Sequence, residues 1–238
     1  MSIIKYITSA LLSIFVCSCA ADFSLHYGNI TMGNFVEGKF ISDQGLTFNI
    51  VERTCSVDID TLERAMISCD ILTCTGKSQY NVRLTDFNPI FSKYPVDSTS
   101  VTDNEIFKED PLSINEVWYS GGYLNMHINV PVKENSRQKH LVNLVRNDME
   151  SSTGMHEFTF KHNAFGEVIT ADDYDFIPSS AYISFPIAQL FKDDEQNIQI
   201  ILNWTSNEET DGILSKETRR NTTSLEIERT GYEHKHLK

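Results

Sequence analysis

A cysteine near the start of the chain carries the clearest chemical prediction in the sequence. One charge, Lys5, and an apolar run that ends at Val16 come before Cys19, and the residue directly before this cysteine, Ser18, is small. This order is typical of a bacterial signal peptide that ends in a lipobox. We therefore expect residues 1–18 to be a lipoprotein signal peptide and the Cys19 thiol to carry a lipid.

Two other interpretations of the N-terminal segment are weaker. The apolar run is short of the roughly 20 residues that a spanning helix needs. A secretory signal cut after Ser18 or Ala20 would need no lipid, and this alternative stays open. Two or three acyl chains anchor a protein stably, so the membrane is the first expected partner, through the lipid on Cys19. The expected location is the cell envelope, with the outer membrane favoured and its face left open.

Three aromatic residues form the main candidate for ligand binding. Trp118, Tyr119 and Tyr123 gather around Gly121 and Gly122. Aromatic rings beside a flexible turn could stack on a sugar ring or hold a peptide. The structural alternative is that the glycines permit a tight bend while the aromatic side chains fill the core.

Histidine and acidic residues raise the question of metal binding. His156 and His162 share one strand face, but at about 3.3 Å per residue they lie roughly 20 Å apart and cannot meet. His127 or His140 could lie near either of them, although such histidines usually have structural roles. Neither acidic loop has the spacing of a calcium-binding loop, so we expect no metal and no cofactor. These loops contain Asp172, Asp173 and Asp175, and Asp193, Asp194 and Glu195.

The sequence contains none of the common catalytic motifs. It has no Gly-x-Ser-x-Gly, no His-Glu-x-x-His and no glycine-rich phosphate loop after a strand. We therefore expect a protein that is not an enzyme. The enzymatic alternative, which ranks third among the functions considered, is a hydrolase whose catalytic residues come from distant segments of the chain.

The net charge of −13 excludes one class of partner. Nucleic acid binding needs clustered Lys and Arg side chains to neutralise phosphates, so no nucleic-acid partner is expected. The acidity is typical of a soluble exported domain. The sequence gives no indication of the oligomeric state.

Three cysteines follow Cys19, and an odd number leaves at least one thiol free. Cys69 is in phase with neighbouring apolar residues and is expected to pack in the core. A disulfide from Cys55 to Cys69 or to Cys74 stays open, because only coordinates give the Cα separation.

Short segments of alternating apolar and polar residues predict an all-β chain. Between residues 35 and 87 these segments are close together, as in a small barrel. Residues 92–115 are rich in Pro, Ser, Thr and acidic residues, which is typical of a connection between two domains. Beyond it, six or seven strands predict a two-sheet sandwich. We expect a barrel domain at residues 19–110, a sandwich at 111–230 and a polar tail at 231–238. The predicted strands are Phe35–Ile41, Leu46–Val51, Arg64–Thr73, Tyr80–Phe87, Leu124–Val130, His140–Arg146, His156–His162, Ala181–Phe185, Ile198–Trp204 and Leu225–Ile227.

Six short motifs resemble the NigD-like lipoproteins of Bacteroidetes. The resemblance implies an N-terminal OB-like barrel, a C-terminal immunoglobulin-like β-sandwich and a cell-envelope lipoprotein linked to bacteriocin operons, without catalytic residues. With this resemblance, the favoured function is a non-enzymatic, lipid-anchored module that binds an envelope protein or a glycan. The second-ranked function is that of an envelope lipoprotein that binds a carbohydrate or a peptide through Trp118–Tyr123. The motifs are Trp118–Asn125, Leu144–Asn147, Phe160–Ala164, Ala181–Phe185, Arg64–Ile67 and Val82–Asp86.

Overall fold

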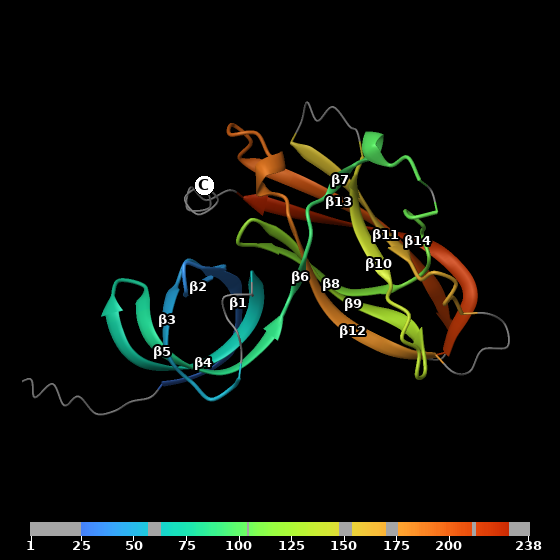
Figure 1. Cartoon of the computed structure of the whole chain (residues 1–238). Coiled ribbons are helices and arrows are strands. Elements are labelled where there is room, and N and C mark those ends of the chain that lie inside the picture. Colours follow the sequence, from blue (N-terminus) through green and yellow to red (C-terminus); the bar gives the residue numbers. More distant parts are fainter. Residues whose placement is uncertain are drawn as a thin grey trace, which may run out of the picture.

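The computed structural model describes residues 25–56, 63–103, 105–147, 154–169, 176–210 and 213–228. Within them the chain forms a closed barrel and two further β-sheets, which face each other (Figure 1). This arrangement confirms the prediction of an all-β chain with a barrel followed by a sandwich. The predicted signal peptide, Cys19, the acidic loop at residues 172–175 and the polar tail lie outside the described residues.

The barrel is built from the first five strands, which close in the order β1-β2-β3-β5-β4. Neighbouring strands pair antiparallel, except for β3 and β5, which pair parallel. This order and this one parallel pair agree with the expected OB-like barrel. The strands are β1 (Leu25–Val36), β2 (Lys39–Ser42), β3 (Thr47–Arg53), β4 (Arg64–Gly76) and β5 (Gln79–Pro89).

The barrel encloses a compact apolar core in which Phe40 and Phe48 are completely buried. The predicted run Phe35–Ile41 is not one strand, because a turn at Glu37 and Gly38 divides it between β1 and β2. Both turn residues have positive φ angles, 50° and 74°, and glycine adopts such a conformation readily.

The segment that leaves the barrel joins both sheets of the sandwich. Strand β6 (Phe91–Ser92) pairs parallel with β12, and strand β7 (Val96–Asp97) pairs parallel with β10. Figure 1 shows this segment running from β5 past β6 to β7. Residues 91–97 therefore pair with strands of the sandwich, while the domain boundary near residue 110 stays a prediction.

The sandwich contains one sheet of five strands and one of four, in the orders β14-β13-β11-β10-β7 and β6-β12-β9-β8. Six of its strands match the segments that alternation predicted, although β10 begins at Leu141, one residue after the predicted start at His140. Strands β6, β7 and β8 were not predicted. The strands after β7 are β8 (Ser113–Ser120), β9 (Tyr123–Lys133), β10 (Leu141–Arg146), β11 (Met155–Asn163), β12 (Phe176–Pro186), β13 (Asn197–Thr210) and β14 (Ile213–Glu228).

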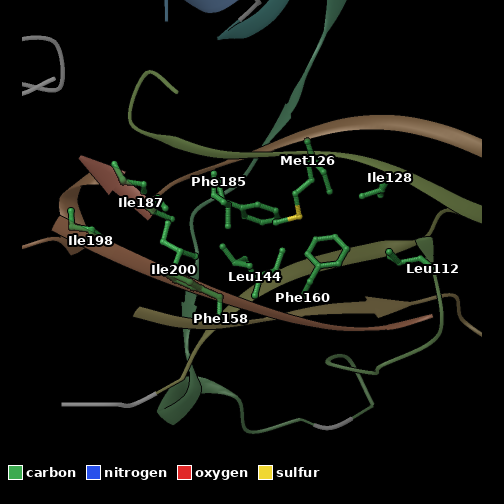
Figure 2. Close-up of a cluster of buried hydrophobic side chains, with 14 of the residues drawn as sticks. Leu112, Met126, Ile128, Leu144, Phe158, Phe160, Phe185, Ile187, Ile198 and Ile200 are labelled. Carbon is green, nitrogen blue, oxygen red and sulfur yellow. The ribbon is translucent and has the colours of Figure 1, made fainter. Parts of the chain in front are cut away.

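Buried side chains from the two sheets meet in one core. Met126 and Phe185 extend from the four-stranded sheet toward Leu144 and Phe160 of the five-stranded sheet (Figure 2). The rings of Phe160 and Phe185 contact edge to face, with centroids 6.0 Å apart. Because strand side chains alternate, the residues between these core positions on β9 and β12 lie on the outer face of the four-stranded sheet. That outer face positions the groups described next.

No helix in the described part of the chain is long and apolar enough to cross a membrane.

Candidate functional site

The three aromatic residues of the predicted ligand site lie in or beside the hairpin that joins β8 and β9. Gly121 and Gly122 form its turn with φ angles of 58° and 88°, which explains the glycine pair. Alternation along β8 places Trp118 and Tyr119 on opposite faces of the sheet. Tyr119 packs toward the sandwich core, with its ring centroid 6.0 Å from that of Phe191.

The side chain of Tyr123 has an environment different from those of Trp118 and Tyr119. Its ring lies against the guanidinium group of Arg64, 3.9 Å from the ring centroid, in a cation–π contact between the sandwich and the barrel. Burial raises the pKa of the Tyr123 hydroxyl, which therefore stays neutral at physiological pH. The structure thus does not bring the three aromatic residues together into one surface, and ligand binding by any of them stays a prediction.

Arg64 is the centre of a buried polar network between the two domains. It begins β4 of the barrel and is 2% exposed, although arginine is almost never so buried without partners. Its five N–H groups all donate hydrogen bonds, so the guanidinium leaves no donor unsatisfied. The acceptors are Ser184 Oγ at 2.9 Å, Asn34 Oδ1 at 3.1 Å, Asn125 Oδ1 at 2.9 Å, and both carboxylate oxygens of Asp43 at 2.9 and 2.8 Å.

Asp43 connects the barrel turn to the sandwich hairpin. Besides its bidentate ion pair with Arg64, its carboxylate accepts a hydrogen bond of 2.6 Å from Ser120 Oγ. A Cβ atom placed on Gly121 would lie 2.3 Å from Asp43 Oδ1, so only glycine permits this approach. Asn125 completes the network, because its amide donates to Ser120 Oγ and its carbonyl oxygen accepts from Ser184 Oγ.

The physical role of this network is to fix one domain on the other. The side chains of Arg64 and Asp43 are each only 1% exposed, so neither charge is solvated by water. Removal of one partner from a buried ion pair of this kind typically costs about 3–5 kcal/mol, because the other charge is left uncompensated. Relative rotation of the domains would break the hydrogen bonds from Arg64 to Ser184 and Asn125 of the sandwich, so the network opposes it.

A second aromatic group lies on the outer face of the four-stranded sheet. The rings of His127 and Tyr182 are stacked, with centroids 4.5 Å apart and planes inclined by 12°. Trp118 contacts Tyr182 edge to face at 6.5 Å, and Ser180 Oγ lies 2.6 Å from His127 Nε2. All three rings are partly exposed, so this cluster is the candidate surface for stacking on a ligand.

The histidines of β11 do not meet each other, as their spacing predicted. His156 Nε2 lies 3.1 Å from Glu195 Oε2 in a buried contact. His162 instead lies 3.0 Å from His140, its Nε2 facing His140 Nδ1, and also contacts the backbone carbonyl of Asp110. Burial lowers the pKa of His162 from 6.5 to about 4, so its ring is neutral at pH 7.

The three described cysteines are all free thiols. Cys69 is completely buried in the barrel core, which agrees with its predicted apolar packing, and burial raises its pKa to about 11. Cys74 is exposed and Cys55 is half-buried. The disulfides from Cys55 that the sequence left open are therefore not present.

Sequence reasoning missed the network around Arg64, although most of its residues fall in the quoted motifs. Arg64 opens one motif, Ser120, Gly121, Tyr123 and Asn125 belong to a second, and Ser184 belongs to a third. Apart from Gly121, which lies in the turn, their common feature is a polar side chain within a strand pattern that is otherwise apolar on one face. A buried polar residue needs partners, so this signal could have indicated that the three motifs meet.

In the described residues, a closed five-stranded barrel is joined by buried hydrogen bonds from Arg64 to a sandwich of nine strands, which defines a class of two-domain, all-β proteins. The family model of the NigD-like C-terminal β-sandwich domain matches residues 94–216, more than half of the chain. The chain therefore belongs to the NigD-like family, as its motifs suggested. No curated protein is a significant match to the chain.

Solved structures with a similar fold come from Bacteroides species. A NigD-like immunity protein from Bacteroides caccae is similar with a TM-score of 0.61 at 17% identity, over 85% of this chain and 97% of that chain. A protein of unknown function from Bacteroides vulgatus has a TM-score of 0.60 at 18% identity, over 86% and 93% of the two chains. A Bacteroides fragilis protein, provisionally named a lipoprotein, has a TM-score of 0.56 at 13% identity, over 84% and 95%. At these identities the likeness concerns the fold.

Proposed function

We propose that this NigD-like protein is a lipid-anchored, non-enzymatic binding protein of the bacterial cell envelope. The observation that carries the proposal is the buried network of Arg64 and Asp43, which holds the barrel and the sandwich in one fixed orientation. A fixed body of two domains is suited to present loops and sheet faces to a macromolecule. Catalysis in a cleft between domains would instead favour a junction that can open and close.

The lipid on Cys19 places the barrel close to the membrane. Strand β1 begins at Leu25, six positions after Cys19, and six extended residues span at most about 20 Å. The provisional naming of the Bacteroides fragilis protein as a lipoprotein supports this part of the proposal. The outer membrane is the proposed location, with the sandwich farther from the lipid than the barrel.

Metabolic labelling with a radioactive fatty acid tests the anchor. The wild-type chain should incorporate label and partition with membranes, and Cys19→Ser should lose both properties. Cys17→Ser is the matched control, because it removes a thiol two positions earlier and should keep the label. An unlabelled wild-type chain, or equal loss in the two variants, would contradict lipidation at Cys19.

The proposed partner is another envelope macromolecule, in a role linked to bacteriocins. This assignment rests on family membership and on the name of the Bacteroides caccae immunity protein. Affinity purification of the full chain from detergent-solubilised membranes should recover one protein in a stoichiometric amount. An oligosaccharide that reproducibly raises the melting temperature, with no protein recovered, would refute this first choice.

A carbohydrate or peptide ligand is the second candidate, because three partly exposed rings cluster on the outer sheet face. Trp118→Ala should then abolish the oligosaccharide-induced rise in melting temperature. Tyr119→Ala is the matched control, since its ring packs toward the core and is not available to a ligand on the outer face. Loss of the ligand effect in Tyr119→Ala alone would exclude the outer-face cluster.

A further inference from the structure

Strand β14 lies at one edge of the five-stranded sheet and pairs with β13 alone among the described strands (Figure 1). It covers Ile213–Glu228 and is the longest strand that the structure describes. Its outer edge therefore presents backbone N–H and C=O groups that no described strand binds. The strand contains neither proline nor glycine, either of which would weaken pairing along this edge. The edge is thus open to one more strand.

The part of β14 nearest the end of the chain is regular. From Thr218 to Glu228 it forms eleven consecutive pairs with β13, and the register shifts just before Thr218. Ile227 packs in the core of the sandwich, so alternation places Arg220 and Glu226 on the outer face of the sheet. The midpoint of this regular stretch is Thr223.

The charges of this stretch have opposite signs on the two sides of Thr223. Arg220 comes three positions before it and Glu226 three positions after it, with no charged residue between them. Both side chains are exposed, as is that of Glu228. If a second copy paired antiparallel about Thr223, Arg220 of each copy would lie directly opposite Glu226 of the other. Opposite charges in this position stabilise a pair of strands.

These charged groups are available to another chain. Arg220, Glu226 and Glu228 form no ion pair with a described side chain. A hydrogen bond from Lys161 lowers the pKa of Glu109, and the charge of Arg220 adds a smaller contribution. Because Glu109 is already paired with Lys161, Arg220 keeps its capacity for a carboxylate partner.

The centre of the stretch is shaped for close approach. Thr222 and Ser224 would face each other across the two copies, and both have short side chains. A surface hollow of about 490 Å³ lies beside them, lined by Gln199, Ile201, Thr222, Thr223 and Ser224. No bulky side chain lines this hollow on β14.

We propose that the free edge of β14 is a dimer interface, at which two copies pair antiparallel about a two-fold axis at Thr223. The five-stranded sheets of the two copies then form one continuous sheet. Two chains with a net charge of −13 repel each other, so association needs a place where opposite charges meet, and this edge supplies it. Both copies use the same edge, so the assembly closes as a dimer and does not grow into a filament. The interface goes beyond the proposed binding function and does not depend on the lipid.

Charge reversal tests the dimer, with the full chain purified in mild detergent and its mass measured by native mass spectrometry at micromolar concentration. The wild-type chain should be a dimer. Arg220→Glu and Glu226→Arg should each weaken it roughly 10–100-fold, because the two-fold axis makes each change replace two attractions by two repulsions. The double variant should restore the dimer. Arg83→Glu is the matched control, since this exposed arginine lies in the barrel and should leave the dimer intact.

A cysteine at the axis tests the register in a Cys74→Ser background, which removes the exposed thiol. Thr223→Cys should form a disulfide between copies on oxidation, because directly opposite residues lie about 4.5–5.5 Å apart. Thr218→Cys is the control, since its two copies would be ten positions and roughly 33 Å apart. Circular dichroism shows that each variant folds.

Four results would overturn the proposal. They are a monomeric wild-type chain, a dimer that neither charge reversal weakens, a double variant no better than the single ones, and equal crosslinking through Thr218→Cys and Thr223→Cys. If the chain is a monomer and Arg220→Glu instead abolishes recovery of another envelope protein, the edge belongs to that protein and not to a second copy.

Discussion

Replacement of Arg64 by methionine should uncouple the barrel from the sandwich. Methionine keeps an unbranched side chain but removes the positive charge and all five donors. Asp43, whose side chain is 1% exposed, would then retain its charge without the counterion. Loss of one partner from a buried ion pair costs about 3–5 kcal/mol. We expect the upper half of this range, because Asn34, Asn125 and Ser184 lose a hydrogen bond as well.

Urea unfolding followed by two probes measures this effect. The two tryptophans, Trp118 and Trp204, both lie in the sandwich, so fluorescence reports on that domain alone. Far-UV circular dichroism reports on the strands of both domains. In the wild-type chain the two transitions should coincide, and in Arg64→Met they should separate, because unfolding is no longer a single cooperative transition. With m near 2–3 kcal/mol per M, a loss of about 4–5 kcal/mol should lower the urea midpoint of the less stable domain by about 1.3–2.5 M.

Arg83→Met is the matched control in the same barrel. Arg83 pairs with Glu52 at 2.7 Å, but the two side chains are 36% and 52% exposed. Such a pair contributes at most about 1 kcal/mol, so its loss should leave the two probes coincident. The double variant Arg64→Met with Asp43→Leu should be more stable than Arg64→Met, since it no longer buries an uncompensated charge. A midpoint shift for Arg64→Met no larger than that for Arg83→Met, with coincident probes, would refute the role of the network.

Two further predictions concern backbone conformation and thiol reactivity. Gly121→Ala should lower the unfolding free energy by about 3 kcal/mol or more, because its φ is 58° and the new Cβ would meet Asp43. Gly45→Ala, at a φ of 80° with open space around it, should cost only about 1 kcal/mol in the same urea experiment, and equal costs would contradict the close approach. At pH 8, mass spectrometry after treatment with iodoacetamide should find Cys74 modified and Cys69 intact, because burial raises the Cys69 pKa to about 11. Equal modification of both thiols in the folded chain would show that the barrel core is open to the reagent.

Much of the strand pattern could be predicted because one sheet face is apolar. Leu124, Met126 and Ile128 alternate with polar residues, and the structure places these three in the core of the sandwich. Strands β6 and β7 could not be predicted in this way. Each has only two residues, which are too few to show alternation. They are strands because β6 pairs with the edge of β12 and β7 pairs with the edge of β10.

The network between the domains could not be predicted for a different reason. Arg64 and Ser184 are 120 positions apart, and nothing local indicates that they touch. The sequence places Trp118 and Tyr123 beside a glycine turn, but it did not show that Arg64 would lie against Tyr123. The spacing of the histidines was more informative, because it excluded contact between His156 and His162. It left His140 as a candidate neighbour of either histidine, and the structure places His140 beside His162.

The two short strands after the barrel also determine how the sandwich can be separated from it. Strand β6 covers part of the edge of β12, and β7 covers part of the edge of β10. An uncovered sheet edge pairs readily with another chain. A fragment that starts at residue 111 would expose both edges and should aggregate, whereas one that starts at Ile90 would keep both strands. The polypeptide that links the two domains therefore also protects the sandwich from self-association.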